Sequence, residues 1–177
     1  MKKNLLAVAV LAASAFSAAA LAADGQVNFT GSITDVACEI DANSKNQTVN
    51  MGKVATTAFA GAGSTDKVTA GDRRFSLILK NCPASVTAAT VRFGGKMVPG
   101  ADGVLALTDA ADMAQGVGIQ ITDESNNVIN LGLDSAVFPL VSTADNKLNF
   151  MASYYALAST VKPGSANAVA QFTIVYQ

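Results

Sequence analysis

Two stretches of the chain, one near each end, alternate regularly between apolar and polar residues. In residues 25–33 the odd-numbered positions are apolar or glycine and the even-numbered ones are polar, and residues 166–177 show a similar alternation. A period of two is the pattern of a β-strand with one face against a core. The predicted inward faces are Gly25, Val27, Phe29, Gly31 and Ile33 in the first stretch, and Ala168, Ala170, Phe172, Ile174 and Tyr176 in the last.

Shorter strands are predicted between these two stretches. The clearest cover residues 73–80, 90–95, 116–122 and 149–157, and two further strands are predicted at 47–52 and 128–131. Clusters of Asp, Asn, Ser, Gly and Pro separate them, as expected for turns. Seven to nine short strands, with no helical stretch longer than about ten residues, predict an all-β fold, a two-layer β-sandwich in one domain.

The first 22 residues have the pattern of an export signal. A positive head, Met1-Lys2-Lys3, precedes an apolar run from Leu5 to Leu11, and small residues end in Ala20-Leu21-Ala22. A membrane anchor needs about 20 apolar residues, whereas the small residues dilute this run. We therefore predict a secretory signal peptide over residues 1–22 and a mature, exported chain that begins at Ala23.

Charged residues are sparse and show no basic cluster. Without Lys2 and Lys3, 10 basic residues stand against 13 acidic ones, a net charge of −3. Binding to nucleic acid through its phosphates therefore has little support, and no nucleic-acid partner is expected. A surface with few charges suits a protein that packs against neighbouring molecules.

The chain has two cysteines, Cys38 and Cys82, and no histidine. In an exported chain a disulfide is the default, and it would close a loop of about 45 residues. A metal site is the weaker alternative, because two isolated thiolates do not complete a tetrahedral zinc site. Neither a metal nor a cofactor is expected.

An exported enzyme is a further alternative. The absence of histidine removes His-dependent triads and most metal centres. Asp109, Asp112, Asp123 and Glu124 lie in turn-like stretches and are most simply solvated loop residues. Composition leaves paired-carboxylate chemistry open, but no motif singles out a pair. We therefore expect no catalytic activity.

Together these features resemble the major subunits of chaperone–usher fimbriae, the type 1 pilin family. The resemblance covers the whole mature chain. It rests on the alternating N-terminal stretch, a cysteine shortly after it, and a second cysteine in Asn81-Cys82. It also rests on Gly164, the fourteenth residue from the end, and on Tyr176, the penultimate residue.

The resemblance implies an immunoglobulin-like sandwich that lacks its final strand and is completed by a donated one. Chaperone–pilin strand donation is an established case of β-strand addition. Residues 23–33 would be the N-terminal donor arm, with Gly25, Val27, Phe29, Gly31 and Ile33 as its donor face. Residues 34–177 would be the pilin domain. Its acceptor groove and chaperone contact would comprise Gly164, Ala168, Ala170, Phe172, Ile174 and Tyr176.

The family also implies partners and a location. The expected partners are neighbouring copies of the chain in a head-to-tail polymer, a periplasmic chaperone and an outer-membrane usher. The chain would pass through the periplasm to the cell surface and serve in adhesion as part of a fimbria.

Three alternatives to these assignments stay open at this point. The N-terminal stretch is also consistent with an ordinary first strand of its own domain. The chain could instead be a minor tip or adaptor subunit with a carbohydrate-binding role, and a weak receptor-binding surface on a shaft subunit is not excluded.

Overall fold

The computed structural model describes residues 26–31, 33, 37–60 and 68–177. The chain divides into two units, Met1–Ile33 and Thr34–Gln177. The predicted signal peptide and Gly25 lie outside the described residues. In the first unit, residues 26–31 and 33 belong to no strand.

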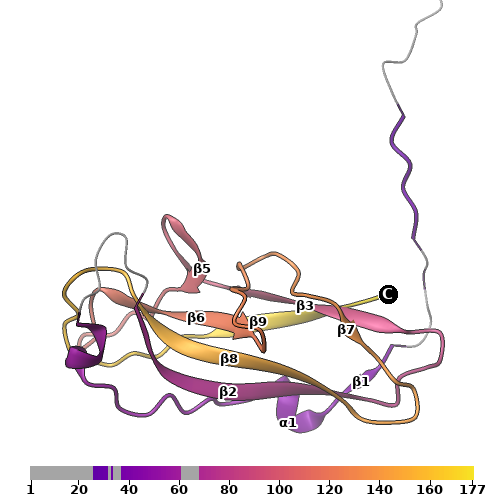
Figure 1. Cartoon of the computed structure of the whole chain (residues 1–177), viewed down its shortest axis with the longest axis horizontal. Helices are drawn as coiled ribbons and strands as arrows, with labels where there is room; N and C mark the ends of the chain where they lie inside the picture. Colours follow the sequence, from indigo (N-terminus) through magenta and orange to yellow (C-terminus); the bar gives the residue numbers. More distant parts are fainter. Residues whose placement is uncertain (1–25, 32, 34–36, 61–67) are drawn as a thin grey trace, which may run out of the picture. The chain divides into compact units, whose positions relative to one another are not determined.

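The second unit is a β-sandwich of two antiparallel sheets (Figure 1). The larger sheet has the order β1 (Glu39–Ile40), β2 (Thr69–Lys80), β8 (Asn146–Ala156), β6 (Val117–Asp123), β5 (Ala101–Leu105) and β4 (Met97–Val98). The smaller has the order β7 (Phe138–Pro139), β3 (Ala88–Gly95) and β9 (Ala170–Tyr176). A helical turn, α1 (Ala42–Lys45), and a 3₁₀ turn, η1 (Thr56–Phe59), are the two helical elements of the described residues.

The predicted two-layer sandwich is therefore confirmed, as are its clearest strands. Residues 73–80, 90–95, 116–122 and 149–157 fall within β2, β3, β6 and β8 apart from a terminal residue or two. Their alternation has the expected effect, since Leu77 and Leu79 of β2 and Val91 and Phe93 of β3 are all buried. The period of two thus identified the core-facing side of both sheets.

Four phenylalanines join the two sheets through the core. Phe150 of β8 lies 5.5 Å from Phe75 of β2, 5.1 Å from Phe93 of β3 and 5.5 Å from Phe138 of β7, as measured between ring centroids. Phe93 and Phe138 meet Phe150 edge to face, an arrangement that aromatic rings favour. The ring of Phe150 therefore holds β2, β3 and β7 together.

The prediction of a strand at residues 128–131 is wrong. Val128 makes one isolated bridge to Thr122, after which the chain leaves β6. The N–H of Leu131 donates to Asp102 O at 2.9 Å, and the N–H of Gly132 donates to Phe93 O at 2.7 Å. Ile129 and Leu131 are buried because the chain crosses from one sheet to the other, whereas Val128 is exposed.

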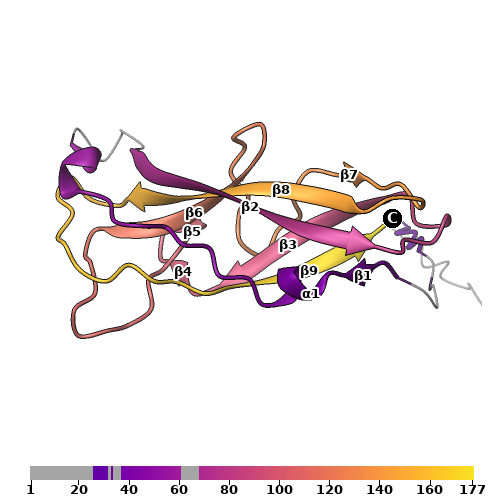
Figure 2. The ribbon, with the colours of Figure 1, turned by 90° about the horizontal axis from the view of Figure 1, so that it is seen from below.

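The prediction of a strand at residues 47–52 is also wrong in one respect. Val49 and Met51 are half-buried and their neighbours are exposed, as in an amphipathic strand. Within the described chain, however, this segment pairs with no other strand. Figure 2 shows the chain between α1 and η1 running alongside the chain that leads into β9. The pattern of side chains is that of a strand, but the partner that would complete it is missing.

Candidate functional site

An apolar groove of about 970 Å³ opens on one side of the sandwich. One side of the groove is the segment 46–52, which we call the groove wall, and the other side is residues 166–172, which lead into and begin β9. Between them the groove reaches the apolar core, whose side chains there are buried except for the half-buried Phe75. The floor consists of Phe75, Leu77, Phe93, Leu105, Ile119, Ile121, Ala152 and Tyr154.

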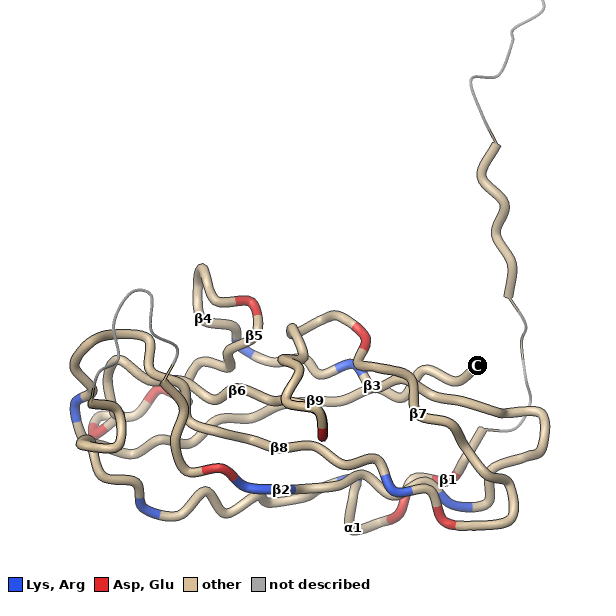
Figure 3. The backbone as a smooth tube through the Cα atoms, viewed as in Figure 1, with Lys and Arg blue, Asp and Glu red and all other residues tan. Residues whose placement is uncertain are grey.

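The groove carries almost no charge. Lys45, at its end, is the one charged residue of its lining, and β9 has none (Figure 3). Phe75 on the floor is half-buried although its ring contacts the rings of Phe93 and Phe150. Apolar side chains that remain accessible in this way gain free energy when a partner covers them, at about 25 cal/mol per Å².

The free edge of β9 borders this groove. Ala88 and Gln177 exchange both of their backbone hydrogen bonds. In an antiparallel ladder such pairs recur at every second residue, so the N–H and C=O groups of residues 171, 173 and 175 point to β3. Those of Ala170, Phe172, Ile174 and Tyr176 point away from β3. No other strand of the described residues pairs with that edge.

The predicted acceptor residues divide into three groups. Ala168, Ala170 and Phe172 line the groove. Ile174 and Tyr176 continue the same face of β9 and are half-buried against the core. Gly164 is not among the lining residues. A Cβ at Gly164 would lie 2.3 Å from Asp112 O and 2.5 Å from Ala114 N, so this glycine is needed for close backbone packing.

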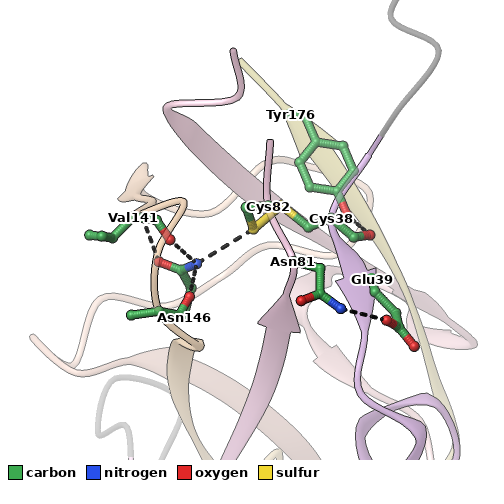
Figure 4. Close-up of a disulfide and its surroundings, with 8 residues drawn as sticks. Cys38, Glu39, Asn81, Cys82, Val141, Asn146 and Tyr176 are labelled. Carbon is green, nitrogen blue, oxygen red and sulfur yellow. Dashed lines mark hydrogen bonds between the residues drawn. A yellow bond between two sulfur atoms is a disulfide. The ribbon is translucent and has the colours of Figure 1, made fainter. Parts of the chain in front are cut away.

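Tyr176 also contacts the region of the disulfide. Cys38 and Cys82 are bonded to each other, as predicted, and no free cysteine remains. The Tyr176 hydroxyl donates to the Cys38 carbonyl at 3.2 Å, and the Asn146 amide contacts Cys82 Sγ at 3.4 Å (Figure 4). Burial raises the pKa of Tyr176. The last strand is thus attached to the chain that precedes β1.

The groove wall is the part of this site that sequence reasoning missed. The alternation of Val49 and Met51 was visible, and it indicated an amphipathic segment. It gave no sign that the segment would lie opposite β9 and leave a gap, because the position of an unpaired strand depends on distant residues.

The predicted donor face is described only in part. Val27, Phe29 and Ile33 are 75%, 93% and 101% exposed. Gly31 has open space where a Cβ would be placed. Three large apolar side chains exposed within seven residues are unusual for a chain that has no partner.

The carboxylates considered as catalytic candidates have structural contacts. Asp109 pairs with Lys96 at 2.7 Å, Asp112 accepts from Ser165 at 3.0 Å, and Glu124 accepts from Asn149 at 2.8 Å. Burial opposes the ionisation of Asp123. The hydrogen bonds that its carboxylate accepts from Asn127 and Ser125 outweigh burial and hold its pKa below the ordinary value.

The described part of the chain offers neither a cluster of metal ligands nor a membrane-spanning helix. No three His, Cys, Asp or Glu residues gather there in a way that could hold a metal ion. Nor does any of its helices have the length and apolar character needed to cross a membrane.

Comparisons with known proteins agree with this architecture. Residues 27–177 match the family described as Fimbrial protein. The type-1 fimbrial protein, A chain, of Escherichia coli (strain K12) is 39% identical over 189 residues that cover both chains fully. An antigen and type I fimbria protein of Burkholderia pseudomallei is 41% identical, with a TM-score of 0.60 over 86% of this chain and 97% of that one.

A further solved structure shows the fold. The P pilus rod subunit PapA has a TM-score of 0.64 at 18% identity, over 80% of this chain and all of that one. Chaperone–usher pilin subunits have an immunoglobulin-like fold that lacks a strand, and the open edge of β9 agrees with this. A minor tip or adaptor subunit is not favoured by these likenesses. The chain belongs to the fimbrial protein family and is a structural subunit of a fimbria.

Proposed function

We propose that the chain polymerises head to tail by donor-strand exchange. The arm of one copy, residues 23–33, enters the groove of the next copy and lies between the groove wall and β9. Val27, Phe29 and Ile33 then cover the apolar floor. The observation that carries this proposal is the groove itself, which has an apolar floor and, along one side, an edge of β9 with which no other strand of the described residues pairs.

The dimensions and chemistry of the two parts match. Nine extended residues span roughly 30 Å, and β9 with the chain leading into it offers residues 166–176 as a partner. An arm in the groove would satisfy the backbone groups of Phe172 and Ile174 that point away from β3. Burying Phe29 or Ile33 contributes about 1.5–3 kcal/mol each. The absence of charge from residues 25–33 removes the cost of desolvating a charged group.

The proposal also covers the route to the cell surface. Residues 1–22 direct export and are removed, and a periplasmic chaperone occupies the groove before assembly. An outer-membrane usher then exchanges the chaperone for the next arm. Because each contact joins two different surfaces, the polymer does not close and grows as an open filament outside the cell. The chain acts in adhesion as a non-catalytic component of that filament.

A charge placed on the donor face tests this function. Phe29→Asp should leave subunits unassembled, because a carboxylate cannot enter an apolar groove without a partner. Asn28→Asp is the matched control, since it adds the same charge at the neighbouring position on the opposite face of the arm. Electron microscopy of cells that also express the export partners would count the fibres.

The two variants separate the possible results clearly. Fibres from Asn28→Asp together with none from Phe29→Asp support strand donation. Abundant fibres from Phe29→Asp would contradict it. Loss of fibres from both variants would also contradict it, because assembly would then depend on the added charge itself and not on which face of the arm carries the charge.

A further inference from the structure

The position of the groove wall depends on a small number of contacts. Within the described residues the wall has no strand partner, so backbone ladders do not fix its distance from β9. A strand that lies between two others needs them roughly 9–10 Å apart, twice the usual spacing. For an inserted arm to pair with β9 beside the wall, contacts other than a shared ladder must therefore hold the wall away from β9.

At its N-terminal end the wall is held through α1. The N–H of Ile78, in β2, donates to Ser44 Oγ at 3.0 Å, and the Ile78 carbonyl accepts from the N–H of Asp41 at 2.9 Å. Lys80 pairs with the carboxylate of Asp41 at 2.8 Å. These contacts attach α1 to the edge of β2.

At the other end of the wall Met51 packs against the core, and Arg73 makes the polar contact. Its Nε donates to the carbonyl of Asn50 at 3.2 Å, and its Nη1 donates to the carbonyl of Asp72 at 2.8 Å. The wall turns at Gly52, whose φ is +71°. A Cβ at Gly52 would lie 3.0 Å from Nη2 of Arg73, so the guanidinium lies against this turn.

An irregularity in β2 brings Arg73 to this position. The register of β2 against β8 shifts between Ala70 and Arg73, and Gly71 there has a φ of +74°. After the shift Arg73 lies opposite Ala152, which lines the groove, so the two side chains are on the same face. The bulge is held from β8, because Ser153 Oγ donates to Asp72 Oδ1 at 2.7 Å.

We propose that Arg73 is a positioning residue for strand donation: by holding the carbonyl of Asn50, it sets the width of the groove and thereby the time that an inserted arm stays bound. This inference rests on the proposed function, since it assumes that the arm is what the groove holds. It goes beyond that function in assigning control of the bound lifetime to a residue that does not touch the arm.

The test measures how fast the arm leaves the groove. The full-length chain is refolded with a fluorescent synthetic peptide of residues 23–33, which we call the arm peptide, and then chased with an excess of unlabelled peptide. Arg73→Met removes the donors and keeps an apolar stem, and Arg73→Lys keeps a charge and one donor group. Arg74→Met is the matched control, because Arg74 is also exposed and its side chain has no hydrogen-bond or ion-pair partner within the described residues.

We expect Arg73→Met to raise the dissociation rate about tenfold, as for the loss of one charge-assisted hydrogen bond. Arg73→Lys should restore part of the difference, and Arg74→Met should match the unsubstituted chain. Hydrogen–deuterium exchange of the bound complexes should quicken in the groove wall of Arg73→Met and stay unchanged in β2 and β8. A purely structural role would instead quicken exchange throughout β2 and β8.

Each outcome bears on one proposal. Equal dissociation rates for Arg73→Met and Arg74→Met would overturn the role of Arg73, as would an evenly spread rise in exchange. If the unsubstituted chain failed to bind the arm peptide, strand donation itself would be contradicted. If Arg73→Met did not refold, Arg73→Lys would decide the question by the same two measurements.

Discussion

At the scale of single residues, two tyrosines of the core also make hydrogen bonds that connect distant segments of the chain. Tyr154 lies on the floor, and its hydroxyl donates to the carbonyl of Ala166 at 3.1 Å. Tyr176 ends β9 and donates to the carbonyl of Cys38. Burial raises the pKa of both hydroxyls, since neither can ionise easily against apolar neighbours.

Replacing Tyr176 with phenylalanine should lower stability by about 0.5–1.5 kcal/mol near neutral pH, the usual contribution of one hydrogen bond. Because the pKa of Tyr176 is raised on folding, its contribution is complete below the unfolded value of about 10 and is lost as pH rises through the folded value. The difference in the free energy of unfolding between Tyr176→Phe and the unsubstituted chain should therefore become smaller as the pH rises above about 10. Urea unfolding of the peptide-bound chain between about pH 8 and pH 11 would measure both effects.

The control for this substitution is Tyr155→Phe in β8. Within the described residues the Tyr155 hydroxyl has no hydrogen-bond partner, so little change is expected. If Tyr176→Phe and Tyr155→Phe lowered the free energy of unfolding equally at neutral pH, the hydrogen bond from Tyr176 to Cys38 would contribute nothing to stability.

At the scale of elements, β9 and the groove wall border the same groove and do not pair with each other. β9 pairs with β3 along one edge and presents its other edge to the groove. The groove wall has the alternation of a strand and no partner in the described chain. An exposed strand edge is a ready site for pairing with another chain, so the two elements together are where we propose that an arm is added.

Binding of the arm peptide should protect alternate amides of β9 from exchange with solvent. Phe172 and Ile174, whose N–H groups point away from β3, should gain protection. Gln171 and Thr173, which already pair with β3, should change little and serve as controls within the same strand. Hydrogen exchange followed residue by residue by NMR would show the alternation. Uniform protection along β9 would indicate general tightening of the domain and would contradict strand addition at this edge.

At the scale of the whole sandwich, the disulfide and the four phenylalanines act at different places. The rings fix the two sheets face to face through Phe150. The bond between Cys38 and Cys82 joins positions 44 residues apart, just before β1 and just after β2. A cross-link of this kind stabilises chiefly by restricting the unfolded chain.

Removing both cysteines, as Cys38→Ala with Cys82→Ala, should lower the free energy of unfolding by about 2–4 kcal/mol. Guanidinium unfolding of the peptide-bound chain would measure this loss. The unsubstituted chain, reduced before unfolding, should lose the same amount. If the double variant were as stable as the oxidised chain, the bond would have no part in holding β1 to β2.

The sequence alone determined which side chains face the core and which cysteines pair. Alternation with a period of two is a local property, so it placed β2, β3, β6, β8 and β9 and the inward face of Phe172 and Ile174. The resemblance to fimbrial subunits was also visible in the sequence, from Asn81-Cys82 to Tyr176.

Only the tertiary structure decided which strand edges are paired. Backbone hydrogen bonds join residues far apart in the chain. No local pattern therefore shows that residues 47–52 pair with no strand of the described chain, or that residues 128–131 cross between the sheets. The same holds for Arg73, whose reach to Asn50 depends on a shift of register against β8. The groove exists because one edge of β9 pairs with no strand of the described chain, and the pairing of an edge is decided by distant residues. The side chains that line the groove follow from the local alternation.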